Sequence, residues 1–203
     1  MDIILASTSL YRQRLLERLQ LPFQCHSPAV DETRLPGEPP ESMSARLALA
    51  KARSVGANYP DALVIGSDQV AALDQRVMGK PGNYEAARAQ LKASAGRVVH
   101  FYTGVALYRA RDALEQFHVE PFKVHFRDLD DQSISNYLQR EQPYDCAGSF
   151  KCEGLGIALF SRLEGRDPTS LEGLPLIALC DLLALAGVAV LGGTASAEDC
   201  EVQ

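Results

Sequence analysis

The sequence lacks the segments that direct a protein to a membrane or out of the cell. Its start, Met1-Asp2, carries no basic stretch, and the apolar run that follows is too short for a signal peptide. No later run approaches the roughly 20 apolar residues that a membrane-spanning helix requires. We therefore expect a soluble, cytoplasmic protein that has no membrane partner.

Cysteine and histidine are scarce, and neither is spaced like a set of soft-metal ligands. The chain has 5 Cys and 4 His, with no CxxC pair and no HxxxH or HExxH spacing. Free thiols that pack as small hydrophobic side chains explain this pattern better than disulfides or bound zinc. We expect neither a zinc site nor a disulfide framework.

The two commonest glycine-rich nucleotide motifs are also missing. No GxxxxGK[ST] sequence occurs, which excludes the P-loop mechanism. Gly154-Leu155-Gly156 begins like a dinucleotide fingerprint, but it lacks the third glycine and opens an expected strand over 154–163 rather than a helix. Any nucleotide site must therefore be built in another way.

Positive charge is in deficit, because 20 Lys and Arg residues face 26 Asp and Glu residues, a net charge of -6. Broad nucleic-acid binding depends on a basic surface that releases counterions from many phosphates, so we expect no nucleic-acid partner. A small phosphorylated ligand remains compatible if cations cluster locally. The hydrophobic share of 46% and charged share of 23% are those of an ordinary globular protein. We expect one domain over residues 1–193 and a disordered acidic tail over 194–203.

Apolar periodicity predicts alternating strands and helices in the first half and antiparallel hairpins in the middle. The expected strands cover residues 3–6, 23–25, 63–66, 98–108, 114–126 and 154–163. The expected helices cover residues 9–20, 41–58, 84–93, 131–140 and 175–185, with Asn83 and Asp130 as N-caps and a hairpin turn at Asp74-Gln75. The composite is a mixed α/β sheet with flanking helices.

A group of hydroxyls and arginines marks the start of the first expected helix. Ser7, Thr8 and Ser9 precede it, and Arg12 and Arg14 lie in or near its first turn. A helix N-terminus offers free N–H donors and partial positive charge, which together bind phosphate. On this segment alone, hydroxyls that cap the helix beside solvated arginines are the simpler interpretation. Cations are unfavourable at that end of a helix, however, and a bound anion would remove the conflict.

Acidic residues follow two of the expected strands. We expect the Gly66-Ser67-Asp68-Gln69 stretch to form a turn at the carboxyl end of a buried strand, where α/β folds present catalytic groups. Glu32 lies beyond the preceding strand and could face the same cleft, and hard divalent cations prefer such oxygen ligands. Lys51 and Lys80 are candidate phosphate ligands. Each residue taken singly is also consistent with a solvated loop or surface position.

Together these segments resemble the Maf family of nucleotide pyrophosphatases, over about residues 3–191. The motifs that carry the resemblance are Ala6-Ser7-Thr8-Ser9 with Arg12, Val30-Asp31-Glu32-Thr33, Ala50-Lys51-Ala52, Gly66-Ser67-Asp68, Gly79-Lys80-Pro81, Tyr102-Thr103-Gly104 and Gly173-Leu174-Pro175. The resemblance implies a two-lobed α/β fold around a central cleft, similar to that of inosine triphosphate pyrophosphatases. It also implies hydrolysis of a nucleoside triphosphate between the α- and β-phosphates, and possible homodimers.

The resemblance assigns roles to particular residues. Asp68 matches the family's catalytic acid, and Arg12, Glu32, Lys51 and Lys80 match active-site positions that handle phosphates and metal. Our hypothesis is that Glu32 and Asp68 help hold a divalent cation, magnesium or manganese, and that Asp68 activates water. Ser7 and Ser9 would bind phosphate together with Arg12.

Three further positions are selective for the base in this family, and here they are Tyr11, Gln69 and Glu153. Their residue types resemble the subgroup that hydrolyses 7-methyl-GTP, although close relatives carry tryptophan where Tyr11 stands and the family usually has proline at Leu10. An aromatic face attracts the positive charge of 7-methylguanine, and a carboxylate accepts its hydrogen bonds. The alternatives are a pyrimidine or broad-specificity house-cleaning pyrophosphatase and a nucleotide-binding regulator of cell division.

Overall fold

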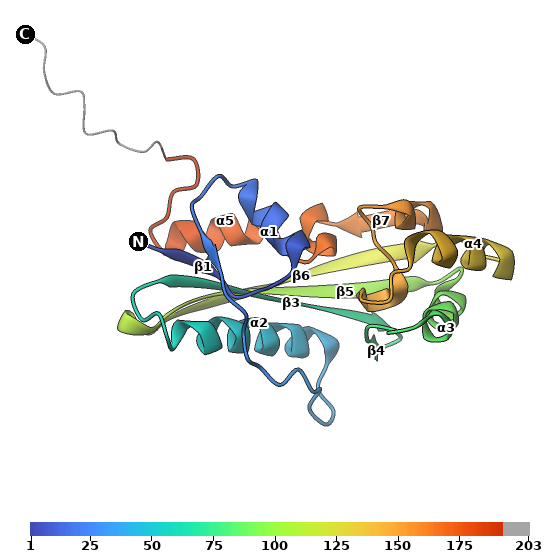
Figure 1. Cartoon of the computed structure of the whole chain (residues 1–203), viewed down its shortest axis with the longest axis horizontal. Helices are drawn as coiled ribbons and strands as arrows, with labels where there is room; N and C mark the ends of the chain where they lie inside the picture. Colours follow the sequence, from blue (N-terminus) through green and yellow to red (C-terminus); the bar gives the residue numbers. More distant parts are fainter. Residues whose placement is uncertain (193–203) are drawn as a thin grey trace, which may run out of the picture.

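A seven-stranded mixed sheet runs the length of the molecule in the computed structural model, which describes residues 1–192 (Figure 1). The strands are β1 Ile3–Leu5, β2 Gln24–Cys25, β3 Leu63–Leu73, β4 Arg76–Met78, β5 Val98–Arg109, β6 Leu114–Phe126 and β7 Phe160–Gly165. The helices are α1 Leu10–Glu17, α2 Pro40–Gly56, α3 Tyr84–Ser94, α4 Asp131–Glu141 and α5 Leu176–Leu185, with short 3-10 helices η3 Leu155–Leu159 and η4 Pro168–Glu172. The order is β2-β1-β3-β5-β6-β7, with β4 paired to β3. This confirms the expected mixed α/β sheet.

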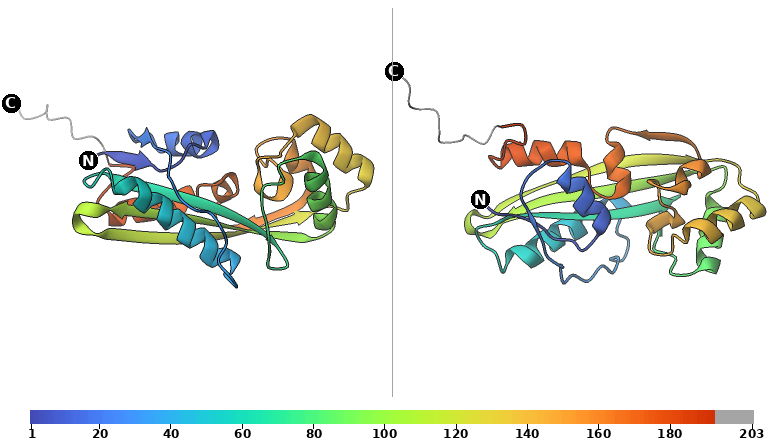
Figure 2. Two further views of the ribbon diagram at one scale, coloured as in Figure 1. Left: turned by 60° about the horizontal axis from the view of Figure 1, so that its bottom comes forward. Right: turned by 45° about the horizontal axis from the view of Figure 1, so that its top comes forward.

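At one end of the sheet, helices cover both faces (Figures 1 and 2). Side chains alternate along a strand, so Ile4 packs with Ala48 of α2 on one face, whereas Leu5 packs with Leu16 of α1 and Leu179 of α5 on the other. The parallel strands β1, β2 and β3 lie in this lobe.

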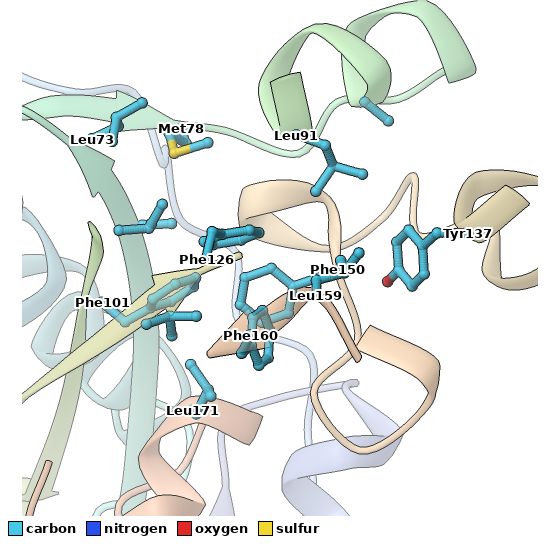
Figure 3. Close-up of a cluster of buried hydrophobic side chains, with 14 of the residues drawn as sticks. Leu73, Met78, Leu91, Phe101, Phe126, Tyr137, Phe150, Leu159, Phe160 and Leu171 are labelled. Carbon is cyan, nitrogen blue, oxygen red and sulfur yellow. The ribbon is translucent and has the colours of Figure 1, made fainter. Parts of the chain in front are cut away.

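The other end of the sheet is covered by α3, α4 and the segment that leads to β7, and it has its own aromatic core (Figure 3). Phe150 meets Phe160 edge to face with ring centroids 4.7 Å apart, and Phe126 meets Phe160 at 5.2 Å. Edge-to-face pairs are favourable beyond their burial. The long strands β3, β5 and β6 run through both lobes, which confirms the expected two-lobed architecture.

One edge of β3 changes partner along its length. Residues 63–65 pair with β1 and residues 71–73 pair with β4, so residues 66–70 face neither of these strands. The chain leaves β1 toward α1 at this point. A cleft can therefore open between the lobes against an otherwise central strand.

Two expectations about strand boundaries are wrong. Asp68 does not lie in a turn after a strand, because β3 continues to Leu73 and pairs with β5 from Val64 to Ala72. Residues 154–163 are not one strand, since Leu155–Leu159 form a 3-10 helix before β7 begins. A Cβ on Gly156 would lie 2.3 Å from the Lys151 carbonyl oxygen, which is the close approach of a tight turn.

The expected helix caps and hairpin turn are confirmed. Asn83 and Asp130 cap α3 and α4 by accepting hydrogen bonds from backbone N–H groups at 2.9 Å and 2.7 Å. Asp74 and Gln75 both have positive φ, as a two-residue hairpin turn requires. The four thiols that the structure describes are free. Within residues 1–192 no helix has the length and apolarity of a membrane span, and the expected tail lies outside the described residues.

Candidate active site

A cavity of about 920 Å³ lies where the two lobes meet. It has the size of a typical small-molecule site. All the side chains singled out from the sequence line it: Ser7, Ser9, Tyr11, Arg12, Glu32, Lys51, Asp68, Gln69, Lys80 and Glu153. The fold therefore brings into one place residues that are spread over most of the chain.

An ion cluster of Glu32, Lys51 and Asp68 lines the cavity. Lys51 Nζ lies 2.7 Å from Asp68 Oδ1 and 2.6 Å from Glu32 Oε1. Lys51 and Asp68 are 6% and 7% exposed, whereas the side chain of Glu32 is 56% exposed. The two carboxylates thus converge on one ammonium group from environments of different polarity.

Glycines allow α2, which carries Lys51, to lie directly against β3 and β5. A Cβ on Gly66 would lie 2.1 Å from the Ala48 carbonyl oxygen, and one on Gly104 would lie 2.4 Å from the Ser44 carbonyl oxygen. Only a residue without a Cβ permits such approach. This packing brings Lys51 within reach of Asp68.

The environment moves the two carboxyl groups in opposite directions. Burial raises the pKa of Asp68, although the nearby Lys51 ammonium opposes the rise. The hydrogen bond from Lys51 lowers the pKa of Glu32. Pairs of acids with separated pKa values are typical of sites that move protons, and here Asp68 is the group better suited to accept one.

The hydroxyl-rich segment before α1 forms the expected helix start. Ser9 is the N-cap of α1, and its Oγ lies 3.5 Å from the Arg12 backbone nitrogen. Ser7 Oγ accepts a 3.1 Å hydrogen bond from the Ser9 backbone N–H. The Arg12 side chain donates through Nε to the Gly173 carbonyl at 2.9 Å, while Asp68 and Glu32 favour its charged form against burial, which lowers its pKa.

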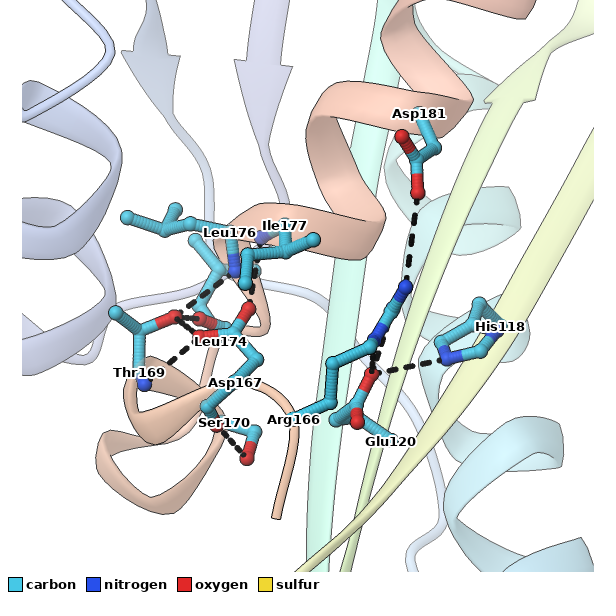
Figure 4. Close-up of polar contacts among 10 residues, drawn as sticks. All are labelled: His118, Glu120, Arg166, Asp167, Thr169, Ser170, Leu174, Leu176, Ile177 and Asp181. Atoms are coloured by element: carbon cyan, nitrogen blue, oxygen red, sulfur yellow. Dashed lines mark hydrogen bonds and ion pairs between the residues drawn. The ribbon is translucent and has the colours of Figure 1, made fainter.

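The loop that carries Gly173 is held by a capping network at the start of α5 (Figure 4). Asp167 Oδ1 accepts from Thr169 N–H at 2.9 Å, and Oδ2 accepts from Ile177 N–H at 2.7 Å. Thr169 Oγ1 in turn accepts from Leu176 N–H at 2.9 Å. The network fixes the backbone carbonyls that orient the cavity side chains.

Gln69 is oriented by that same loop. Its Nε2 lies 2.8 Å from the Ser170 carbonyl oxygen and 3.1 Å from that of Leu171. It also lies 3.2 Å from Thr103 Oγ1. The amide nitrogen is therefore occupied by protein groups, whereas within residues 1–192 no hydrogen bond uses the amide oxygen, which is left for a ligand.

A second group of acids lines the cavity and does not belong to the ion cluster. Glu153, Asp145 and Glu172 all line the cavity. Burial raises the pKa of Tyr11, and the charges of Glu153 and Asp145 raise it further. Burial and the charge of Glu153 also raise the pKa of Glu172. This part of the cavity disfavours additional negative charge and favours a cation.

The sequence reasoning gave no role to several residues that shape the site. Ser67 Oγ lies 2.8 Å from the carbonyl oxygens of both Gly104 and Gly173, so it ties β3 to β5 and to the η4 loop. Glu172 also lines the cavity, and the sequence predicts no role for it. The sequence feature nearest to it is the Gly173-Leu174-Pro175 motif. In the structure Gly173 has a φ of 109°.

The chain is similar to known proteins over nearly all its length. The family of Maf-like proteins matches residues 2–186. A 7-methyl-GTP pyrophosphatase of Nitrosococcus oceani is 57% identical over 189 residues, which cover 93% of this chain and 95% of that protein. A solved HAM1 protein of Coxiella burnetii covers 91% of this chain and 99% of its own, with a TM-score of 0.53 and 14% identity, and shows the shared fold alone. Placed beside the motifs and the cavity that joins them, these matches show that the chain belongs to the Maf family.

Proposed function

We propose that this protein hydrolyses 7-methyl-GTP to 7-methyl-GMP and pyrophosphate. The observation that carries the proposal is the cavity itself, which is lined both by cations with Asp68 and by Tyr11 with the acids that act on it, Glu153 and Asp145. The 57% identity to a 7-methyl-GTP pyrophosphatase supports the choice of substrate. Removal of a modified nucleotide from the pool is the corresponding role.

Asp68 is the proposed base. The residue is 7% exposed and burial raises its pKa, so its carboxylate accepts a proton more readily than a solvated aspartate. It would orient and deprotonate the water that attacks the α-phosphorus. Arg12, Lys51 and Lys80 would offset charge on the triphosphate and the departing pyrophosphate, and Ser7 and Ser9 would bind phosphate oxygens at the start of α1.

The carboxylates of Glu32 and Asp68 fit a divalent cation. Both converge on Lys51 Nζ, so their oxygens lie close together. Within residues 1–192 no three acidic, histidine or cysteine side chains gather into a complete ligand set. Magnesium commonly binds through one or two carboxylates with substrate phosphates and water completing its shell. When bound, such a cation would neutralise phosphate charge as a Lewis acid.

Base selection falls to the residues around Tyr11. Methylation gives guanine a positive charge, which an aromatic face stabilises by about 0.5 to 2 kcal/mol. Glu153 would accept hydrogen bonds from the guanine ring and its amino group, and the free oxygen of Gln69 offers a further acceptor. Uracil and thymine lack this pair of donors.

A panel of nucleotides tests the proposal. Pyrophosphate release is measured for 7-methyl-GTP, GTP, UTP and dTTP with magnesium or manganese, and again after chelation. We expect the highest kcat/KM with 7-methyl-GTP, no turnover after chelation, and a loss of at least 100-fold, the usual minimum for a general base, in folded Asp68→Asn protein.

Equal rates with all four nucleotides would contradict the proposed substrate. Full activity of Asp68→Asn would contradict its role as the base. Tight nucleotide binding without pyrophosphate release under any metal would instead favour a regulatory protein.

A further inference from the structure

We infer that Glu172 is a second specificity-determining residue, which acts with Glu153 to select a purine that carries positive charge. The inference rests on the proposed function, because it concerns how the same cavity recognises its base. It adds a residue from a different part of the chain, the end of η4, to the three selective positions expected from the sequence.

The position of Glu172 is the first support. The residue lines the cavity, is half-buried, and directly precedes Gly173, whose carbonyl holds the Arg12 side chain. The Asp167 network fixes this loop through the hydrogen bonds of Figure 4. Glu172 is therefore presented to the cavity from a braced backbone rather than from a free surface loop.

The absence of a countercharge is the second support. Among the residues that the structure describes, neither Glu172 nor Glu153 has a basic nitrogen within 4.0 Å. Glu32 and Asp68, by contrast, both contact the Lys51 ammonium. Burial raises the pKa of Glu172, the charge of Glu153 raises it further, and the charge of Arg18 opposes the rise.

The negative charges of Glu153 and Glu172 repel each other, and a positively charged ligand bound beside them would offset this repulsion. A neutral base of the same shape would not. The charge of Glu153 acts on both Tyr11 and Glu172, and all three residues line the cavity. This combination selects for charge, whereas Tyr11 alone would accept any flat ring.

A comparison of three substrates separates charge from shape. 7-Methyl-GTP carries the positive charge, 7-methyl-7-deaza-GTP has the same methyl group on a neutral ring, and GTP has neither. We expect wild-type kcat/KM to be higher for 7-methyl-GTP than for the deaza analogue. In Glu172→Gln this ratio should fall roughly five- to tenfold, the size expected for one charge interaction in a partly buried site.

The control variant is Glu17→Gln, which makes the same chemical change on an exposed residue outside the cavity and should keep the wild-type ratio. Glu172→Asp retains the charge and should retain most of the selectivity. Calorimetric binding of 7-methyl-GMP and GMP gives a readout that does not require turnover, and Glu172→Gln should weaken only the first.

The outcomes distinguish the inference from the proposed function. If the wild type prefers 7-methyl-GTP and Glu172→Gln keeps the full ratio between charged and neutral analogues, the inference is wrong and the proposed function stands. If the wild type releases no pyrophosphate from 7-methyl-GTP, the proposed function itself fails. If Glu172→Asp loses selectivity as fully as Glu172→Gln, the effect is one of shape, and the charge argument is overturned.

Discussion

Lys51 shows most clearly how one residue joins stability and chemistry. It is buried to 6% exposure, and two carboxylates hold its ammonium. From the sequence alone, a lysine in an alanine- and leucine-rich helix is equally a surface residue. Its burial depends on Asp68, 17 residues later, and no local pattern reports that pairing.

We predict that Lys51→Met lowers the free energy of unfolding by about 3 kcal/mol at pH 7, because Asp68 stays buried without a partner. Glu32 is more than half exposed and adds little. Urea unfolding measures the change. Lys123→Met removes one partner of an exposed pair with Glu164 and should cost no more than about 1 kcal/mol.

The loss of unfolding free energy in Lys51→Met should become smaller as the pH falls from 7 toward 5. The folded-state pKa of Asp68 is already raised by burial, and loss of the ammonium raises it further. A carboxyl group whose pKa is higher in the folded state than in the unfolded state destabilises the fold at pH values above its folded-state pKa. This penalty disappears as the pH falls toward the unfolded-state pKa and the group becomes protonated. A loss of unfolding free energy that is equal at both pH values, or as small as that of Lys123→Met, would contradict the claim that Lys51 stabilises the buried Asp68.

At the scale of elements, the contact between α2 and the sheet decides the geometry of the site. The sequence predicts both α2 and the start of β3, because their apolar periodicities are strong. It misplaces the end of β3, since Ser67, Asp68 and Gln69 interrupt the apolar run. These three polar residues remain within the strand because Ser67 and Gln69 bond to the η4 loop and Asp68 to Lys51.

We predict that Gly66→Ala displaces α2, because the added methyl group would lie 2.1 Å from the Ala48 carbonyl oxygen. The cost should be about 2 kcal/mol of stability, as for overpacked cores, and activity should fall more than tenfold because Lys51 moves away from Asp68. Thermal unfolding and steady-state kinetics measure both effects.

Gly79→Ala is the matched control for stability. A Cβ on Gly79 has no neighbour within 4 Å, so the change should stay within about 0.5 kcal/mol. If Gly66→Ala were as stable and as active as the wild type, α2 would not set the position of Lys51 as described.

At the scale of the whole molecule, the cavity is formed by several distant segments. The sequence identifies each segment by itself but does not predict that they are adjacent. Ser9, Asp68 and Glu153 come from three separate segments of the chain. The family motifs select such residues, and the fold class follows from the alternation of elements. Their adjacency depends on the mixed sheet, on the change of partner along β3, and on contacts such as Gln69 with Ser170, 101 residues apart.

The distribution of charge is also visible only in the folded molecule. The chain carries a net charge of -6, yet Arg12, Lys51 and Lys80 gather on one cavity. This is the local cluster that a phosphorylated ligand requires in an acidic protein. The acids that act on Tyr11, Glu153 and Asp145, line the same cavity and suit a cationic base. One cavity thus combines opposite electrostatic preferences, which matches a substrate with an anionic triphosphate and a positively charged ring.

The central claim is that this cavity cleaves 7-methyl-GTP at the α-phosphorus. Phosphorus NMR of the reaction, run in ¹⁸O-labelled water and followed by mass spectrometry of the nucleotide product, tests it most directly. We expect 7-methyl-GMP and pyrophosphate in equal amounts, with the label in 7-methyl-GMP. Formation of 7-methyl-GDP and orthophosphate, or label in the pyrophosphate, would contradict it.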